Sequence, residues 1–245
     1  MISLLRKQDQ IQARIFGGNF HTNKPVANGA SPALAPYSTL FYWSHAIATD
    51  DVEFGLHPHE GWEIMTFVLA GENTHYDTQT KTWTPLYAGD FQVIQAGSGL
   101  QHAEKISKGT RSFQIWFDPN FTTSLQQQPA YTDYHADQLT LVMEQGLSTR
   151  YYIGGNSPAR ATTAGLVIKT ISIPANTALV LALDTSLDQG IYVLHGSLAI
   201  AGLRLSPNDA LRVTQETELP IQAATDTDLF IIQTPRHPTY PVVWN

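Results

Sequence analysis

Short runs of alternating hydrophobic and polar residues recur along the chain, and Gly, Pro, Asn and Asp separate them. Alternation with a period of two is typical of β-strands that bury one face. The runs predicted to form strands are 38–43, 63–69, 90–95, 112–117, 166–173, 177–183, 191–194 and 229–234. No long run has apolar residues at helical spacing, and we expect only short helical pieces near 122–128 and 135–139. The pattern predicts an all-β sandwich or barrel.

One local pattern occurs twice. Residues 67–71 (F-V-L-A-G) precede 86–93 (L-Y-A-G-D-F-Q-V), and residues 192–196 (Y-V-L-H-G) precede 205–213 (L-S-P-N-D-A-L-R-V). Each copy predicts a strand, a glycine turn, a strand, a tight turn ending in Asp, and a further strand. Although V-L-x-G describes many hairpins, the matching turn after each copy favours a true repeat. We therefore expect two similar barrels in tandem.

Two short motifs carry the candidate chemistry. His57 and His59 lie in G-L-H-P-H-E-G-W-E, and His102 and Glu104 lie in A-G-S-G-L-Q-H-A-E. Side chains at i and i+2 on a strand share a face and are roughly 7 Å apart. Two such strands inside one barrel bring three imidazoles and one carboxylate together, which is a set of ligands for a metal ion. Pro58 cannot donate a ladder hydrogen bond, so we expect this segment at a strand end or sheet edge, open to a substrate.

Other interpretations of these residues are weaker. Glu63 competes with Glu104 for the carboxylate role, but it would lie roughly 13 Å from His59 along a straight strand. Two closely spaced pairs among nine histidines make ordinary surface or core histidines a poor explanation. The stretch 75–77 (H-Y-D) could support the ligands, but we predict that it lies on an exposed hairpin. Surface or structural roles are predicted for the isolated histidines His21, His45, His135, His195 and His237.

The second copy of the repeat lacks a histidine pair. No histidine follows residue 213 until His237, and the stretch 184–190 contains none. We therefore place the metal site in an N-terminal domain, residues 1–125, and predict that residues 126–245 form a structural or interface domain. The polar stretch 118–137 would connect them.

Composition narrows the function classes. Apolar residues make up 42% and charged residues only 14% of the 245 residues, which favours strands and a sizeable core. The chain has no cysteine, which excludes disulfides, thiolate ligands and a cysteine nucleophile. A net charge of −7 without any Lys/Arg run argues against direct nucleic-acid binding. No run approaches the ~20 apolar residues of a membrane span or suggests a signal peptide, so we expect a cytoplasmic protein without a membrane partner.

The charge of the site suggests its chemistry. Three neutral imidazoles, one carboxylate and one divalent ion sum to about +1, which attracts an anionic oxygen such as a phenolate or enolate. An octahedral ion with these four ligands keeps two open positions, which suits Fe(II) and O₂; Mn, Ni, Cu and Zn remain alternatives.

The motifs resemble those of the pirin family and pirin-like bicupins. H-P-H-E-G-W-E is similar to the family's H-P-H-R-G-F-E, and A-G-D-F-Q-V-I-Q-A-G-S-G-L-Q-H-A-E is similar to P-G-D-x-Q-W-M-T-A-G-x-G-I-x-H-x-E. The resemblance spans roughly residues 17–117, and the closing P-V-V-W is also similar. It implies two tandem cupin barrels (double-stranded β-helix, jelly-roll), with iron in the first on His57, His59, His102 and Glu104. Glu60 stands where the family often has Arg, which bears on substrate preference.

The resemblance implies two alternative functions. Some family members are quercetin 2,3-dioxygenases, so the first is an Fe(II)-dependent oxidoreductase that opens a flavonol or similar enol with O₂, with Glu104 as ligand and general base. Other members are regulatory proteins, so the second is a metal-dependent module that binds a protein partner without turnover.

Overall fold

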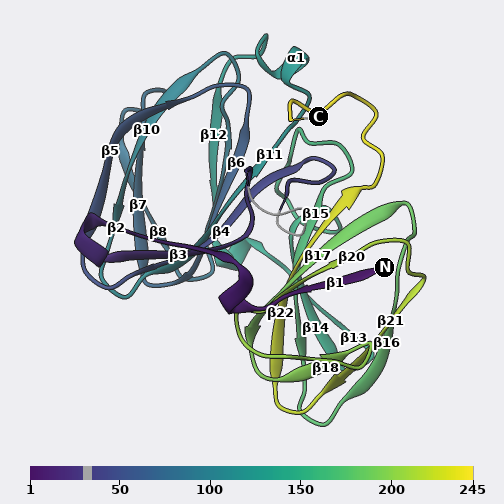
Figure 1. The fold of residues 1–245 in the computed structure, drawn as a ribbon. Helices are drawn as coiled ribbons and strands as arrows, with labels where there is room; N and C mark the ends of the chain where they lie inside the picture. The colour runs from purple at the N-terminus through teal and green to yellow at the C-terminus, as the bar shows by residue number, and fades with distance from the viewer. Residues whose placement is uncertain (30–34, 245) are drawn as a thin grey trace. The chain divides into compact units, whose positions relative to one another are not determined.

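The computed structural model describes residues 1–29 and 35–244, and β-strands dominate them (Figure 1). The chain forms two compact units, and each is described by itself. The N-terminal barrel comprises Gln10–Gln138, Ala161–Ala164 and Thr239–Asn245. The C-terminal barrel comprises Met1–Asp9, Leu139–Arg160 and Gly165–Pro238.

The N-terminal barrel contains a seven-stranded and a four-stranded sheet. The larger sheet has the order β12-β9-β6-β11-β4-β3-β2, and the smaller one has the order β5-β10-β7-β8. Its strands are β2 (Ile11–Ile15), β3 (Phe20–Val26), β4 (Leu40–Ala48), β5 (Val52–His59), β6 (Glu63–Ala70), β7 (Glu72–Asp77), β8 (Trp83–Tyr87), β9 (Phe91–Gln95), β10 (Leu100–Ile106), β11 (Arg111–Phe117) and β12 (Ala130–Tyr134). The short helical elements are η2 (Phe16–Gly18), α1 (Phe121–Ser124) and η3 (Ala136–Gln138).

The C-terminal barrel repeats this architecture. Its sheets have the orders β1-β20-β17-β22-β15-β14-β13 and β16-β21-β18-β19. Its elements are β1 (Ile2–Leu5), η1 (Lys7–Asp9), β13 (Leu141–Glu144), β14 (Leu147–Ile153), β15 (Val167–Ile173), β16 (Ala178–Ala182), β17 (Leu187–His195), β18 (Leu198–Ile200), β19 (Leu203–Leu205), β20 (Ala210–Val213), β21 (Glu218–Ala223) and β22 (Thr227–Pro235).

The two strand orders match element by element, with one exchange. Strands β2–β11 and β13–β22 occupy corresponding places, but β1 pairs with β20 of the C-terminal barrel and β12 pairs with β9 of the N-terminal barrel. Equivalent aspartates hold the segment that follows each exchanged strand. Asp90 accepts a hydrogen bond from the Ala136 backbone, and Asp209 accepts one from the Lys7 backbone, each at 2.9 Å. The internal repeat of the sequence is therefore a repeat of the fold.

The predicted all-β class is confirmed, and the predicted strands coincide with β4, β6, β9, β11, β15, β16, β17 and β22. The two expected helical pieces correspond to α1 and η3, which are single turns. Within the part of the chain that the structure describes, no helix is both long and apolar enough to cross a membrane.

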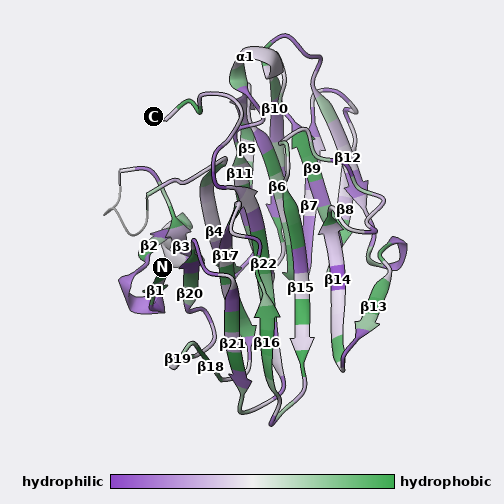
Figure 2. Cartoon of the chain, turned by 90° about the vertical axis from the view of Figure 1, so that its right-hand side faces the viewer, coloured by the Kyte–Doolittle hydropathy of each residue, from purple (hydrophilic) through white to green (hydrophobic). Residues whose placement is uncertain are grey.

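The interiors of the two barrels differ in polarity. Aliphatic residues of both sheets fill the C-terminal barrel, and green stretches recur along β16 and β21 (Figure 2). Strand register identifies the residues that replace the N-terminal motif there. They are Leu181 for His57, Leu219 for His102 and Ile221 for Glu104. The N-terminal barrel instead buries polar residues between its sheets, and this is where the candidate site lies.

Candidate metal centre and adjoining cavity

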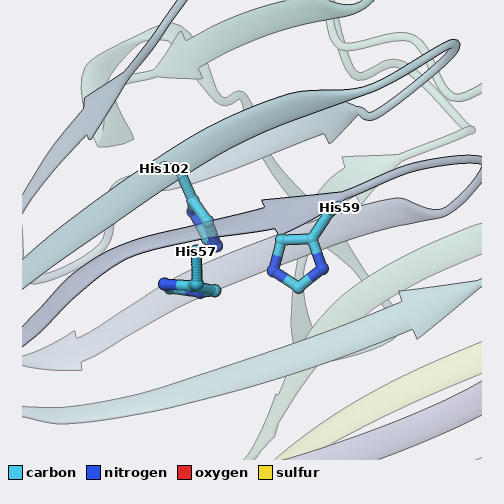
Figure 3. A group of neighbouring side chains, drawn as sticks. All are labelled: His57, His59 and His102. Carbon is cyan, nitrogen blue, oxygen red and sulfur yellow. The ribbon is translucent and has the colours of Figure 1, made fainter.

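Two neighbouring strands present the three histidines. His102 on β10 lies opposite His57 on β5, and Leu100 lies opposite His59. Strand β5 forms the edge of its sheet, as Pro58 predicted. The imidazole of His57 is centred 5.1 Å from that of His59 and 4.2 Å from that of His102, and the three rings converge (Figure 3).

A backbone contact orients the ring of His57. Its Nδ1 lies 2.8 Å from the carbonyl oxygen of Gly55. Because a carbonyl oxygen only accepts, Nδ1 carries a proton and donates it, which leaves Nε2 as the ring nitrogen that can bind a metal. This is the usual way in which an outer hydrogen bond orients a metal-ligating imidazole.

A second histidine orients His102. The Nδ1 atom of His102 lies 2.8 Å from Nε2 of His75 on β7, and His75 stacks on Tyr131 with ring centroids 4.9 Å apart. With His102 donating through Nδ1, its Nε2 retains a lone pair. That Nε2 is buried and has no hydrogen-bond partner within the described structure. A buried polar atom without a partner is costly, and a metal ion would satisfy it.

Burial favours the neutral form of His59 and His102. Desolvation, followed by the charges of His75, His57 and His59, lowers the pKa of His102 to about 2. Desolvation and then His57 lower the pKa of His59 to about 4. The ring of His59 also meets Trp116 edge-on, with centroids 4.9 Å apart. Neutral imidazole is the form that binds a metal, so the barrel prepares these side chains for that role.

The donor atoms fit one ion. One ring nitrogen from each of His57, His59 and His102 lies within 4.8 Å of the other two. Ligands at 2.0–2.2 Å from one ion lie at most about 4.4 Å apart, so a small inward movement closes the set. These three imidazoles could therefore hold a metal, which would also give the buried Nε2 of His102 a partner.

Glu104 lies outside this group of three donors. Its carboxylate accepts hydrogen bonds from Asn73 Nδ2 and Gln114 Nε2, both at 3.5 Å. Desolvation raises the pKa of Glu104, with these two hydrogen bonds and His57 opposing the shift. A buried carboxylate without a cation beside it is unfavourable, and a metal ion held by the histidines would supply the missing charge.

A partly enclosed cavity of about 190 Å³ adjoins His57 and Glu104 inside the barrel. Its other lining residues are Ala13, Ile15, Phe20, Thr22, Lys24, Tyr42, Ser44, Ala46, Phe54, Thr66, Asn73, Ile106, Ser112 and Gln114. A separate open groove of about 650 Å³ runs past His59 and the exposed Glu60 on the outside. The cavity is the better candidate for a reacting ligand because it is more enclosed than the groove and touches the carboxylate.

Two sequence interpretations change at this site. The stretch 75–77 is not on an exposed hairpin: His75 is 1% and Asp77 0% exposed, because β7 is an inner strand of its sheet. The signal for His75 was the polar alternation Asn73, His75, Asp77, which gives three inward side chains on one strand. Glu63 accepts hydrogen bonds from the backbone of Thr162 and Thr163, at 2.7 and 2.9 Å, so its role is to anchor that segment.

The fold and site together define a bicupin whose N-terminal barrel has a histidine cluster able to hold a metal. Residues 20–117 match the Pirin family model. The N-terminal barrel is therefore similar to the Pirin family over these residues.

Similar proteins cover nearly the whole chain. A quercetin 2,3-dioxygenase of Escherichia coli K12 is 25% identical, over 85% of this chain and 88% of that protein. A pirin-like protein of Caulobacter vibrioides is 27% identical, over 80% of this chain and 83% of that protein. The crystal structure of the bacterial pirin YhhW from Escherichia coli in complex with nickel(II) superposes with a TM-score of 0.79 at 23% identity, covering 97% of this chain and 100% of that one. That superposition establishes the shared bicupin fold.

Proposed function

We propose that the N-terminal barrel is the active site of a metal-dependent dioxygenase that opens a flavonol or a similar enol with O₂. The observation that carries the proposal is the convergence of three imidazoles beside a buried carboxylate and a partly enclosed cavity. We assign His57, His59, His102 and Glu104 as the ligands and Fe(II) as the ion, with Mn, Ni, Cu and Zn as alternatives. The name of the similar Escherichia coli dioxygenase supports the reaction.

The chain's own residues bind and orient the substrate. A bound ion supplies Lewis-acid attraction for an enolate oxygen and, if it is redox-active, electron exchange with O₂. The raised pKa of Glu104 makes its carboxylate the acceptor for the proton of the substrate hydroxyl. The aromatic and aliphatic walls of the cavity hold the ring and exclude water. O₂ then adds to the enolate carbons, and the ring opens with loss of CO.

The first test measures metal content and turnover together. Purified protein should contain about one ion per chain and consume O₂ with quercetin or a related enol. His57→Ala and His102→Ala should lose the ion and at least about 100-fold in turnover, as expected for loss of a ligand. The exposed His237 provides the control, since His237→Ala should keep both. Unchanged turnover in a chelator-stripped sample would refute the proposal.

A regulatory role is the second candidate, and the ligand-free C-terminal barrel favours it. Leu181, Leu219 and Ile221 replace the motif there, so that barrel has no corresponding chemistry to perform. In this case the metal would stabilise one conformation that binds a protein partner. Metal-dependent capture of a partner, with no turnover across a flavonoid panel, would favour it. The cytoplasmic location stays a prediction from the sequence.

A further inference from the structure

The cavity beside the candidate metal centre contains one lysine. Lys24 on β3 lines it and is half-buried, with its Nζ 5.3 Å from the centroid of the Tyr42 ring. Among the described residues, no ion pair involves Lys24. Lys24 therefore presents a positive charge to whatever enters the cavity.

Strand geometry places Lys24 on the inner face. Phe20, Thr22 and Lys24 alternate along β3, and all three line the cavity. On β2, Ala13 pairs with Thr22 and Ile11 pairs with Lys24, so the alternation of β3 is regular as far as Lys24. The register on β4 shifts between Asn23 and Val26, beside Ser44. Residues at i, i+2 and i+4 of a strand share a face, so the charge points inward because of the fold and not because of a chance rotamer.

Three buried polar atoms of the same cavity have no hydrogen-bond partner within the described residues. They are Thr22 Oγ1, Ser44 Oγ and Asn73 Oδ1. Thr22 and Ser44 are 9% and 2% exposed. Buried hydroxyls normally have partners, and a hydroxyl can donate to an anionic oxygen. A ligand with an anionic group near Lys24 would satisfy both hydroxyls.

The size of the cavity limits the ligand. Its volume of about 190 Å³ is below the roughly 300–1,000 Å³ of pockets for drug-sized molecules. An engineered cavity of about 150 Å³ is known to hold benzene. The side chains of Phe20, Phe54 and Ile106 supply apolar walls. The cavity is therefore sized for one ring with small substituents, smaller than a three-ring flavonol.

The cavity also sets the spacing between the two ends of the ligand. Gln114, which contacts Glu104, lies opposite Ser44 on β4, and β3 is the next strand. Two strand spacings place the Lys24 backbone roughly 10 Å from β11. Lys24 and Gln114 therefore line the cavity from strands two positions apart in the sheet.

From these observations we infer that the preferred substrate is a one-ring enol with a second, anionic group, and that Lys24 determines this specificity. The inference rests on the proposed function, since the enol oxygen is the end that faces the metal centre. It narrows the substrate class from flavonols to small cyclic enols that carry a carboxylate or a similar group.

A matched pair of ligands tests this inference without turnover. Comenate and kojic acid are both one-ring hydroxypyranones, and they differ in a carboxylate against a hydroxymethyl group. Binding to the Ni(II)-loaded protein is measured by calorimetry under nitrogen, with quercetin as the flavonol. We expect comenate to bind about tenfold or more tightly than kojic acid, the size of a charge-assisted hydrogen bond. Lys24→Met should abolish that preference and leave kojic acid affinity unchanged, and Lys24→Arg should retain the preference.

The outcomes separate the two proposals. Equal affinity for comenate and kojic acid in the unaltered protein, or a preference that survives Lys24→Met, would overturn the role of Lys24. Tight binding of quercetin with no binding of either one-ring ligand would overturn the size argument and leave the proposed function intact. Failure of all three enols to bind the Ni(II)-loaded protein would count against the proposed function itself. Circular dichroism and thermal unfolding of each variant confirm that it is folded.

Discussion

At the residue scale, one ring nitrogen of His57 and one of His102 are held by hydrogen bonds. His57 donates through Nδ1 to Gly55, and His102 meets His75 through Nδ1, so both Nε2 atoms face the common centre. His75 acts on the centre through His102, which makes it a positioning residue. It is buried because β7 lies between β10 and β8 in the sheet.

The same burial predicts how acid affects the metal-free protein. Desolvation lowers the pKa of His75 to about 4, with Asp77 opposing the shift. Because the pKa of His75 is lower in the folded than in the unfolded protein, acid favours unfolding. The stabilisation of the folded state is therefore complete above pH 6.5 and is lost as the pH falls towards 4. Burial of His75 should cost roughly 2 to 3 kcal/mol in the free energy of unfolding at pH 4.5 relative to pH 7. The half-exposed His59, also at about 4, should contribute less because solvent screens it.

Urea unfolding at the two pH values measures this effect. Glu104 changes the free energy of unfolding in the opposite direction. Because its pKa is raised in the folded protein, its contribution to stability is lost as the pH rises. The comparison is therefore made in the Glu104→Gln background, with and without His75→Gln. A pH dependence that His75→Gln leaves unchanged would contradict the argument.

Substitution of the two buried glutamates, Glu63 and Glu104, should affect metal content differently. Glu63 is 0% exposed and holds Thr162 and Thr163, so Glu63→Gln should lower the free energy of unfolding by about 1–3 kcal/mol and leave the metal content unchanged. Glu104→Gln should weaken metal binding because it removes the only carboxylate among the proposed ligands. Elemental analysis together with urea unfolding tests both variants. Loss of the ion in Glu63→Gln, with full occupancy in Glu104→Gln, would reverse the assignment.

At the scale of elements, the repeat is visible in its hairpins. Gly71 and Gly196 lie in the turns before β7 and β18 and have φ values of +78° and +85°, where L residues are strained. A Cβ on Gly71 would lie 2.6 Å from Thr110 Oγ1, and the equivalent Thr227 crowds Gly196 at 2.5 Å. The Thr110 hydroxyl also donates to the Glu72 carbonyl at 2.8 Å. Both barrels therefore require glycine at this turn for backbone conformation and for space.

Replacement of Gly71 separates these two requirements. Gly109 has a φ of +86°, and a Cβ added there would meet no atom within 4 Å, so Gly109→Ala should cost only the strain of about 1–2 kcal/mol. Gly71→Ala should cost clearly more, because the Thr110 backbone must also move. Chemical denaturation of the two variants compares them. Equal losses of stability would mean that the close approach to Thr110 has no energetic importance.

At the scale of the whole molecule, the exchange of first strands links each repeat to the other repeat's sheet. Ile2 and Leu4 on β1 pack against the aliphatic core of the C-terminal barrel. Arg6 and the Lys7 backbone both donate to Asp209, at 3.0 and 2.9 Å. The first nine residues therefore belong structurally to the barrel built by the last hundred.

Removal of residues 1–9 tests this exchange. The truncated chain should lose several kcal/mol of stability in the C-terminal barrel, because each buried aliphatic side chain contributes about 1.5–3 kcal/mol. Its metal content should match that of the full chain, since the candidate centre lies in the other barrel. Differential scanning calorimetry and elemental analysis measure the two effects. Leu4→Ala should reproduce part of the loss, and unchanged unfolding of the truncated chain would contradict the account.

Much of the fold was predictable because its signals are local. The alternation of Val167–Ile173 and the other strand runs is a property of neighbouring residues, and so is the i, i+2 spacing of His57 and His59. The position of His75 was predicted wrongly, since its neighbours Tyr76 and Asp77 indicated a hairpin. Strand β8 forms a hairpin with β7, but β7 becomes an inner strand because it also pairs with β10, which is distant in sequence.

The sequence by itself determined the β class, the duplication and the two histidine motifs, because each is written in residues a few positions apart. Only the tertiary structure decided the partner of His102, the separate roles of Glu63 and Glu104, the charge of Lys24 inside the cavity and the exchange of β1 with β12. These features depend on contacts between strands that are distant in sequence. Such contacts are set by the packing of both sheets together, which no short stretch of sequence specifies.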